Sequence, residues 1–439
     1  MQDWLTKTAA EQGRAIGRGE LDPQALTDAY LEKARPRGDI YARLTEARAR
    51  REAEAAARRA RENRRVGPLD GVPISWKDLF DTAGDATEAG SKLLEGRVPE
   101  RDAEVLRAAT AQGLVCLGKT HMSELAFSGL GLNPMTGTPP NINDDGAVPG
   151  GSSSGAAASV AFGTASAGIG SDTGGSVRIP SAWNDLVGLK TTSGALSLEG
   201  VVPLCAQFDT VGPLARSVED AALLHAAMGG GAAPDLKGVS LKGVHFAVLD
   251  TIVQDDIEER PAAAFAEALA RLQDAGAQIT EIDVPELAAP MALSGILFTS
   301  EAYGTWGKEI EANPDKMFPE ILNRFRAGKD QNAADYVAAW QTVDQARAAW
   351  ADAVAPFHAV LTPTAAIVPP NKARLQTDSD YYVRSNLLAL RNTRVGNLMG
   401  LCALSLPTSE RSCGLQVLGR ARGEAALLRL GAAVEQALA

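Results

Sequence analysis

The sequence predicts an α/β protein, in which helices pack against a central sheet. Short apolar runs bounded by turn residues, at 71–78 and 114–117, are typical of strands. A helical spacing of apolar residues lies between them, at 105–112, so the order along the chain is strand, helix, strand. The alternation continues later, with strands predicted at 244–249 and 359–361 and helices at 262–275 and 334–355.

The N-terminal part is predicted to be helical. The pattern from Trp4 to Ala34 is interrupted at 19–23, where Asp22 and Pro23 are typical of a helix N-cap and a first helical position. A long helix rich in Ala, Arg and Glu is predicted over 41–65. Its basic residues alternate with Glu and Ala, which is typical of a solvent-exposed helix face and not of a binding surface.

Composition narrows the class of protein. The chain has 439 residues, a length that allows two or three domains or one large α/β unit. Its 45% hydrophobic and 22% charged residues are ordinary for a globular protein and exclude a disordered chain. The net charge of −11, without any basic stripe, excludes nucleic acid as an expected partner.

The cysteines and the N-terminus indicate a reducing compartment. Four cysteines are scattered without a C-x-x-C pair or a histidine at ligand spacing, so we expect no disulfide framework and no zinc site. They are Cys116, Cys205, Cys402 and Cys413. The first residues lack the apolar run of a signal peptide, and no stretch is apolar enough to span a membrane. We therefore expect a cytoplasmic protein with no membrane partner.

One segment, 150–178, is unusually rich in Gly, Ser and Ala. Such a composition is also typical of a flexible linker. However, Ala156 to Phe162 reads as a helix of small residues ended by Gly163, and apolar residues recur after it. We therefore expect an ordered segment, in which small side chains allow the backbone to pack closely.

Two familiar motifs match by letter but not by context. Residues 113–120 match the phosphate-binding expression G-x-x-x-x-G-K-T, yet the intervening apolar residues read as a strand and not as a flexible loop. Residues 151–155 match the nucleophile elbow G-x-S-x-G, yet a polar loop precedes them where an apolar strand is required. The four histidines are each typical of core or surface positions; they are His121, His225, His245 and His358.

A lysine is then the remaining candidate for a general base. Lys77 follows an apolar run, and burial there would lower its pKa, so that the neutral amine could deprotonate a hydroxyl. The carboxylates of Asp78 and Asp172 would oppose this shift if they lie close to the amine. The alternative is an exposed lysine paired with Asp78. Downstream, Gly174 and Gly175 directly precede Ser176, an arrangement that suits an oxyanion hole at a nucleophile. A plain Gly-Gly turn between strands is the alternative.

Taken together, the run from Gly150 to Ser181 resembles the amidase signature of the Ser-Ser-Lys amide hydrolases. The match includes the GGSSSG opening, the small-residue helix and the closing GSDTGGSVRIP. The resemblance implies a single α/β domain over 1–439, with a central mixed, mostly parallel twisted sheet flanked by helices. It also implies a signature core at about 66–220 and a more variable, helical and substrate-shaping part at about 230–350.

The resemblance also implies roles for individual residues. Ser176 corresponds to the nucleophile, Ser152 to a bridging serine on a cis peptide, and Lys77 to the base. Backbone N–H groups are expected to stabilise the oxyanion; they belong to Thr173, Gly174, Gly175 and Ser176. Supporting roles are expected for Ser153, Asp172 and Arg178. The implied reaction passes through an acyl-enzyme and uses a small-molecule amide, without a metal or a cofactor.

Two departures from the family pattern leave the substrate open. The chain has 191–195 as Thr-Thr-Ser-Gly-Ala where many members have Pro-Thr-x-Gly-Arg, and 408–413 lacks a frequent Gly-x-Pro-Gly-Gln stretch. We expect a stand-alone amidase, with carbamates or esters as related substrates. The alternative is the glutamine-hydrolysing component of a tRNA-dependent amidotransferase, its A subunit, which releases ammonia for companion chains. A homodimer also remains open.

Overall fold

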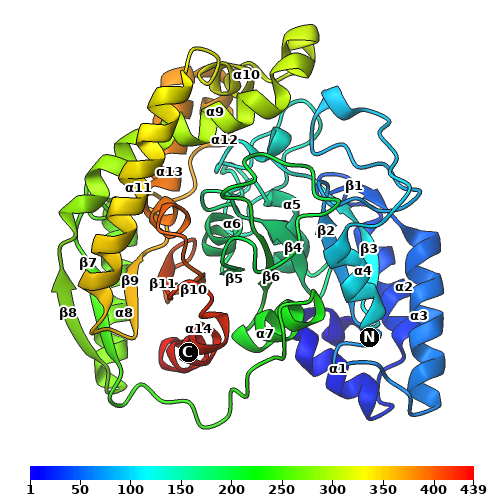
Figure 1. Ribbon diagram of the computed structural model, residues 1–439. Coiled ribbons are helices and arrows are strands. Elements are labelled where there is room, and N and C mark those ends of the chain that lie inside the picture. Colours follow the sequence, from blue (N-terminus) through cyan, green and yellow to red (C-terminus); the bar gives the residue numbers. More distant parts are fainter.

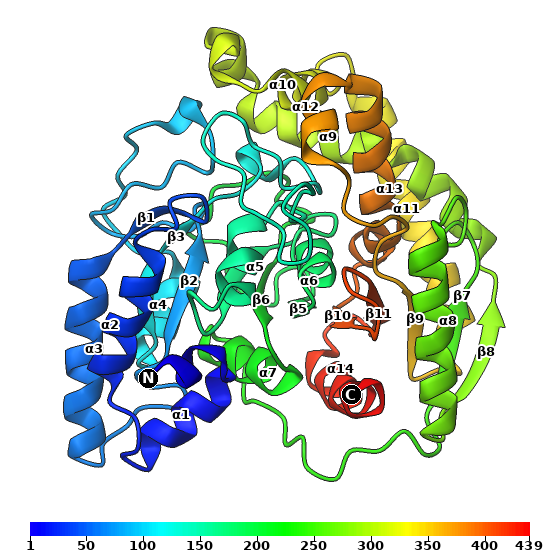
Figure 2. The same ribbon diagram turned by 180° about the vertical axis from the view of Figure 1, so that it is seen from behind.

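The computed structural model describes residues 1–439, and an 11-stranded sheet crosses it from β8 to β1 (Figure 1). The strand order is β1-β3-β2-β4-β6-β5-β10-β11-β9-β7-β8. Helices α1 to α3 lie beside the β1 end of the sheet, while α9 to α13 gather at its other side, as both views show (Figures 1 and 2). The prediction of one α/β domain with a mixed sheet flanked by helices is confirmed.

The elements have the following bounds. The strands are β1 (Tyr41–Leu44), β2 (Pro73–Lys77), β3 (Val115–Thr120), β4 (Gly168–Ser171), β5 (Val187–Lys190), β6 (Val211–Ala215), β7 (His245–Leu249), β8 (Gln278–Ile282), β9 (Ala359–Pro363), β10 (Ala403–Pro407) and β11 (Gly414–Leu418). The α-helices are α1 (Ala9–Gly17), α2 (Pro23–Ala34), α3 (Glu46–Arg61), α4 (Glu104–Ala111), α5 (Ser154–Ala161), α6 (Arg178–Trp183), α7 (Val218–Ala227), α8 (Glu259–Asp274), α9 (Ala288–Ala312), α10 (Pro319–Arg326), α11 (Ala333–Val354), α12 (Lys372–Thr377), α13 (Ser379–Leu398) and α14 (Glu424–Leu438).

The balance of strand directions differs from the expectation of a mostly parallel sheet. Six of the ten neighbouring pairs are antiparallel and four are parallel. The parallel pairs include β2 with β3 and β7 with β8, whose connections contain the crossover helices α4 and α8. By contrast, β10 and β11 are joined by the short connection 408–413, which is compatible only with an antiparallel hairpin.

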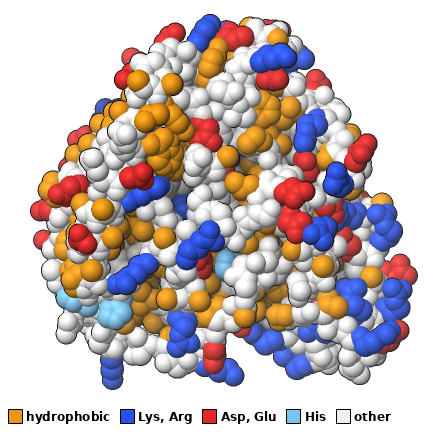
Figure 3. All heavy atoms as spheres, viewed as in Figure 1, with side chains coloured by type: hydrophobic (Ala, Val, Ile, Leu, Met, Phe, Trp, Pro, Cys, Tyr) orange, Lys and Arg blue, Asp and Glu red, His pale blue; other side chains and the backbone are white.

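The helix predicted over 41–65 is shorter than expected, because its first residues form a strand. Tyr41–Leu44 pairs antiparallel with β3, and Tyr41 is buried with its hydroxyl donating to the Thr164 carbonyl at 2.8 Å. Long-range pairing therefore overrides local helix propensity here. The remaining helix, α3, buries four of its alanines and presents most of its charged residues to solvent, although Arg48 and Glu52 are largely buried. Acidic and basic side chains accordingly crowd the edge of the molecule where α3 lies (Figure 3).

The Gly-, Ser- and Ala-rich segment is ordered, and the linker interpretation is wrong. Its helix α5 is almost entirely buried and lies against β4 and β2. Small residues are required because the backbones approach closely. A Cβ atom at Gly155 would lie 2.7 Å from backbone atoms of His121 and Ile40. The helix therefore fits beside the strand ends that bear the candidate site.

The four cysteines are buried free thiols. No helix of the structure combines the length and apolar character that crossing a membrane would require.

We predict that Gly155→Ala destabilises the protein by about 1–3 kcal/mol, because the new methyl group would clash with backbone atoms that cannot move aside easily. Urea denaturation of the purified variant measures the change. Gly304→Ala in α9 is the matched control, since no atom lies within 4 Å of its new Cβ. That control should be neutral or stabilising, by up to about 1 kcal/mol. Equal stabilities for the two variants would contradict the close-packing argument.

Candidate active site

Lys77 is the last residue of β2, and its side chain is fully buried. Its Nζ atom donates to the Ser152 hydroxyl and to the Ser171 hydroxyl, each at 2.7 Å. The neighbouring Asp78 instead pairs with Lys119 at 3.3 Å and with Arg43 at 2.6 Å. The alternative of an exposed lysine paired with Asp78 is therefore wrong.

The surroundings of Lys77 favour its neutral form. Burial lowers the pKa of Lys77 to about 7, and the carboxylates of Asp209 and Asp172 oppose this shift only in part. The sequence predicted that Asp172 and Asp78 would oppose this lowering of the Lys77 pKa. Asp172 does so, but Asp78 forms its own ion pairs, and Asp209 is the second carboxylate that opposes the shift. A substantial fraction of Lys77 is thus unprotonated near neutral pH, as a general base requires.

Ser152 lies in the turn that leads into α5. Its peptide bond with Gly151 is cis, as the sequence resemblance implied. The Ser152 hydroxyl has the expected hydrogen bond from Lys77. No hydrogen bond joins it to the Ser176 hydroxyl, although the Ser153 N–H donates to the Ser176 carbonyl at 3.2 Å and holds the two turns together. Catalytic hydrogen bonds often tighten only when substrate binds.

A buried ion pair organises the turn between β4 and α6. Arg178 donates through Nε and Nη2 to the two carboxylate oxygens of Asp172, at 2.9 and 2.8 Å. Asn397 adds a donor at 2.9 Å. Burial alone would raise the pKa of Asp172, but the Arg178 charge and these hydrogen bonds hold it well below its usual range. Asp172 is therefore a fixed negative charge next to the candidate nucleophile.

The same carboxylate decides which backbone N–H groups are free. Asp172 accepts from the N–H of Gly175 at 2.8 Å and from that of Val177 at 3.2 Å. The Gly175 N–H therefore points to Asp172 and differs from our expectation of an oxyanion donor. The N–H groups of Thr173, Gly174 and Ser176 have no partner in the protein. They are the donors that remain for a developing negative charge.

Two residues of the site carried no assigned role in the sequence. Ser171 ends β4 and accepts from Lys77, while its own N–H donates to the Ser153 hydroxyl at 3.3 Å. Asp209 is buried, accepts from the Thr173 hydroxyl, and has its pKa raised to about 6 by burial. Ser171 directly precedes Asp172 at a strand end, a position that could have signalled its part in the site. Asp209 depends on a long-range contact that no local pattern reveals.

The two rejected motifs are explained by the same structure. Lys119 of the phosphate-binding expression is buried in β3, where it donates to Thr87 and pairs with Asp78. Ser153, the central serine of the elbow expression, bonds to the backbone of Ser171. His121 is buried with its ring against Gly38 and touches neither Lys77 nor a candidate serine through a hydrogen bond.

Ser176 lines a narrow cavity of about 20 Å³. The walls also contain Thr173 and Gly174, together with residues from distant helices. The other lining residues are Ala126, Phe127, Ser128, Leu204, Phe298, Arg324, Leu390 and Arg394. The cavity therefore brings together the candidate nucleophile, the three residues that bear the free N–H groups and five hydrophobic side chains. Apolar walls with a few placed polar groups are typical of small-molecule sites.

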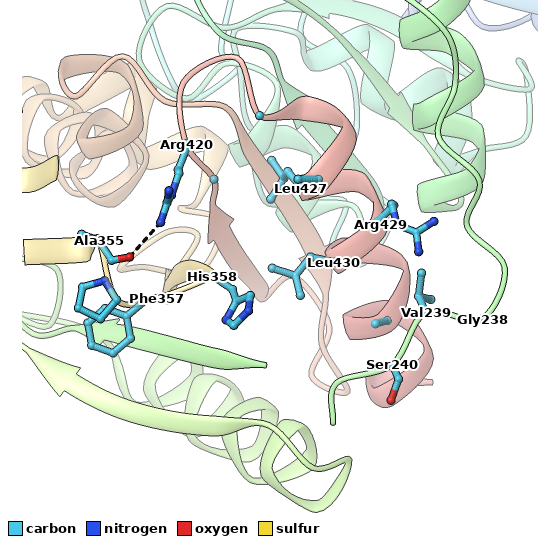
Figure 4. Close-up of a pocket in the computed structure, with 15 residues that line it drawn as sticks. Gly238, Val239, Ser240, Ala355, Phe357, His358, Arg420, Leu427, Arg429 and Leu430 are labelled. Atoms are coloured by element: carbon cyan, nitrogen blue, oxygen red, sulfur yellow. Dashed lines mark hydrogen bonds between the residues drawn. The ribbon is translucent and has the colours of Figure 1, made fainter. Parts of the chain in front are cut away.

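A larger cavity, of about 770 Å³, lies beside α14 and the start of β9 (Figure 4). Leu427 and Leu430 of α14 line one side of it, and Phe357 and His358 lie across from them. None of the candidate site residues reaches this cavity. Cavity size alone would therefore not identify the candidate active site, because Ser176 lines the smaller cavity.

Comparisons with known proteins show which family the chain belongs to. The amidase family model matches residues 25–428. A 2-amino-5-chloromuconic acid deaminase from Comamonas testosteroni is 34% identical, over 97% of this chain and 95% of that protein. The A subunit of the glutamyl-tRNA(Gln) amidotransferase from Halorhodospira halophila is 31% identical, over 98% and 97%. A crystal structure of an amidase superposes with a TM-score of 0.89 at 31% identity, covering 99% of this chain and all of that one.

We predict that Asp172→Asn destabilises the protein by about 3–5 kcal/mol, because it leaves the Arg178 charge buried without a counter-charge. Denaturant unfolding measures the loss. Asp39→Asn is the matched control, since Asp39 pairs with Arg37 at the surface and its side chain is 46% exposed. That change should cost at most about 1 kcal/mol. Similar losses in the two variants would contradict the organising role of the buried pair.

Proposed function

Because the chain belongs to the amidase signature family, we propose that it hydrolyses a carboxylic amide through Lys77, Ser152 and Ser176. The observation that carries the proposal is the hydrogen bond from a buried lysine of lowered pKa to Ser152, whose turn is joined to that of the cavity-lining Ser176. Named relatives that cleave C–N bonds support the reaction class; one solved relative is a peptide amidase from Stenotrophomonas maltophilia at 28% identity.

In the proposed first half-reaction, the Ser176 oxygen attacks the amide carbon. The Ser176 proton moves to Ser152, while the Ser152 proton moves to neutral Lys77. The N–H groups of Thr173, Gly174 and Ser176 stabilise the negative charge on the former carbonyl oxygen. When the tetrahedral adduct collapses, the C–N bond breaks and the protons return along the same path to the leaving nitrogen. Ammonia or an amine departs, and the acyl group stays on Ser176.

In the second half-reaction, water attacks the acyl ester. Ser152 accepts the water proton and again passes a proton to Lys77, and the reverse transfer restores the Ser176 hydroxyl as the acid leaves. Ser171 and Asp172 act as positioning residues. Ser171 fixes the Lys77 ammonium group or amine through its hydrogen bond, and Asp172 fixes the turn that bears the N–H donors. Carbamates and esters share this acyl chemistry and belong in the same assay.

We propose that the helical part of the chain shapes the substrate. Phe298 and Arg324, which line the cavity beside Ser176, support the range of about 230–350. Leu390 and Arg394 line it too, so the substrate-shaping part extends beyond that range to α13.

A second candidate is the glutamine-hydrolysing component of a tRNA-dependent amidotransferase. The similarity to the Halorhodospira halophila protein over nearly the whole of both chains favours it. The two candidates are separated by assaying the purified chain alone for ammonia release from glutamine and from simple amides. Activity restricted to glutamine, or seen only with companion chains, supports the second candidate.

We predict that Ser176→Ala lowers amide turnover by about 10⁴-fold or more, because no acyl-enzyme can form without the hydroxyl. Steady-state ammonia release measures the loss. Ser193→Ala is the control, since the Ser193 hydroxyl only donates to the Gln207 carbonyl away from the cavity. An alanine variant at 176 that keeps wild-type activity would refute the nucleophile assignment.

We predict that kcat/KM for an amide rises with pH and levels off above about 7, because Lys77 must be neutral to accept a proton. Protonation removes the base as the pH falls through the folded-state pKa, so the acidic limb reports Lys77. Lys77→Ala should lose about 10²–10⁴-fold in rate and also lose this limb. A limb that persists in the variant would point to another group, with His121 as the first to test.

A further inference from the structure

Two arginines from separate helices line the cavity that contains Ser176. Arg324 comes from α10 and Arg394 from α13, while Thr173, Gly174 and Ser176 belong to the turn after β4. Both arginine side chains are partly buried. The helical part of the protein thus brings two cationic groups into the space where a substrate would lie.

Neither guanidinium group is neutralised by the protein. Arg324 donates to the Phe127 carbonyl at 3.0 Å, and Arg394 donates to the Ser294 hydroxyl at 3.0 Å. No ion pair in the structure includes either arginine. By contrast, Arg326, two residues after Arg324 on α10, pairs with Glu311 at 2.8 Å. Because an arginine carries five N–H donors in a planar fork, most donors of both groups remain free.

The two groups also influence each other. Burial lowers the pKa of Arg324 to about 10. Burial and the nearby charge of Arg324 lower the pKa of Arg394 to about 9. Both values are above neutral pH, so both groups are cations there. Two uncompensated cations in a partly buried cavity are unfavourable for folding, which is the pattern expected where a ligand supplies the missing charge.

The rest of the cavity restricts what that ligand can be. The wall is otherwise largely apolar, with Phe127, Phe298 and Leu390 among its residues, and it contains no carboxylate. Each guanidinium lies over an aromatic ring, Arg324 at 4.4 Å from the Phe127 centroid and Arg394 at 5.9 Å from that of Phe298. A short carbon skeleton suits this wall, and a planar carboxylate matches the guanidinium fork.

We propose that the acyl part of the substrate carries a carboxylate, which Arg324 and Arg394 bind while the amide carbonyl lies at Ser176. The inference rests on the proposed amidase function and narrows its substrate to monoamides of short dicarboxylic acids. Hydrolysis of such a compound gives the dicarboxylic acid and ammonia or an amine. An α-ammonium group, as in glutamine, is disfavoured, because the arginines repel it and no cavity carboxylate can pair with it.

The test compares pairs of amides that differ only by a carboxylate in place of a methyl group. The pairs are malonamate with propionamide, succinamate with butyramide, and glutaramate with valeramide. We expect kcat/KM to be roughly ten- to a hundredfold higher for the better carboxylate members. Glutaramate should also exceed glutamine, which has the same chain plus an α-ammonium group.

Variants then assign the preference to the two arginines. Arg324→Gln and Arg394→Gln should each reduce the carboxylate preference, which is the ratio of kcat/KM between the two members of a pair, about tenfold or more. Arg326→Gln is the matched control on the same helix, since Arg326 pairs with Glu311 and does not line the cavity. Thermal melting checks folding, and neither cavity variant should melt below the control, because each removes an uncompensated charge.

Calorimetric binding of malonate, succinate and glutarate to Ser176→Ala protein separates this inference from the proposed function. Binding that disappears in the arginine variants supports the inference even if no amide is cleaved, in which case the proposed function fails alone. Equal turnover of both members of every pair overturns the inference and leaves the amidase assignment intact. Absence of dicarboxylate binding, or equally tight binding of inorganic phosphate, also overturns it.

Discussion

The buried ion pair between Asp172 and Arg178 is the constraint on which the rest of the site depends. Its carboxylate accepts from Gly175 and Val177, and this fixes the turn that presents Ser176 and the free N–H groups of Thr173 and Gly174. The same negative charge limits how far burial lowers the pKa of Lys77. Asp172 therefore fixes the shape of the turn, and together with Asp209 it partly opposes the effect of burial on the pKa of Lys77. Because Asp172 is already saturated with donors, it can perform these tasks without itself titrating near neutral pH.

The fold places these groups through its strand ends. Lys77 ends β2 and Ser171 ends the adjacent β4, which pairs parallel to β2, so their side chains meet at one edge of the sheet. Helix α5 then brings Ser152 to Lys77 from the side, which its small residues permit. The site retains a buried lysine, and the cavity beside it retains two arginines without a counter-charge. Residues that are unfavourable for folding mark the places where binding or proton transfer is expected.

Much of this site was predictable because its parts are close in sequence. Ser152, Asp172, Ser176 and Arg178 lie within one ordered segment, and Lys77 follows a recognisable strand. Features that depend on long-range contacts were not predictable. Tyr41–Leu44 forms a strand only because β3 is beside it, and Asp209 joins the site only through its contact with Thr173, 36 positions earlier in the chain. Arg324 and Arg394 are single residues on distant helices, and nothing local distinguishes them from surface arginines.

The central claim is that Ser176 becomes acylated, and mass spectrometry of the trapped intermediate tests it most directly. The protein would be mixed with an activated ester or amide, quenched in acid within the first turnover, and digested. We expect a mass increase equal to the acyl group on the peptide that contains Ser176, and a slower appearance of that adduct as the pH falls below about 7, where Lys77 is protonated. An adduct on a different residue, or turnover without any covalent adduct under conditions that trap a control serine hydrolase, would contradict the account.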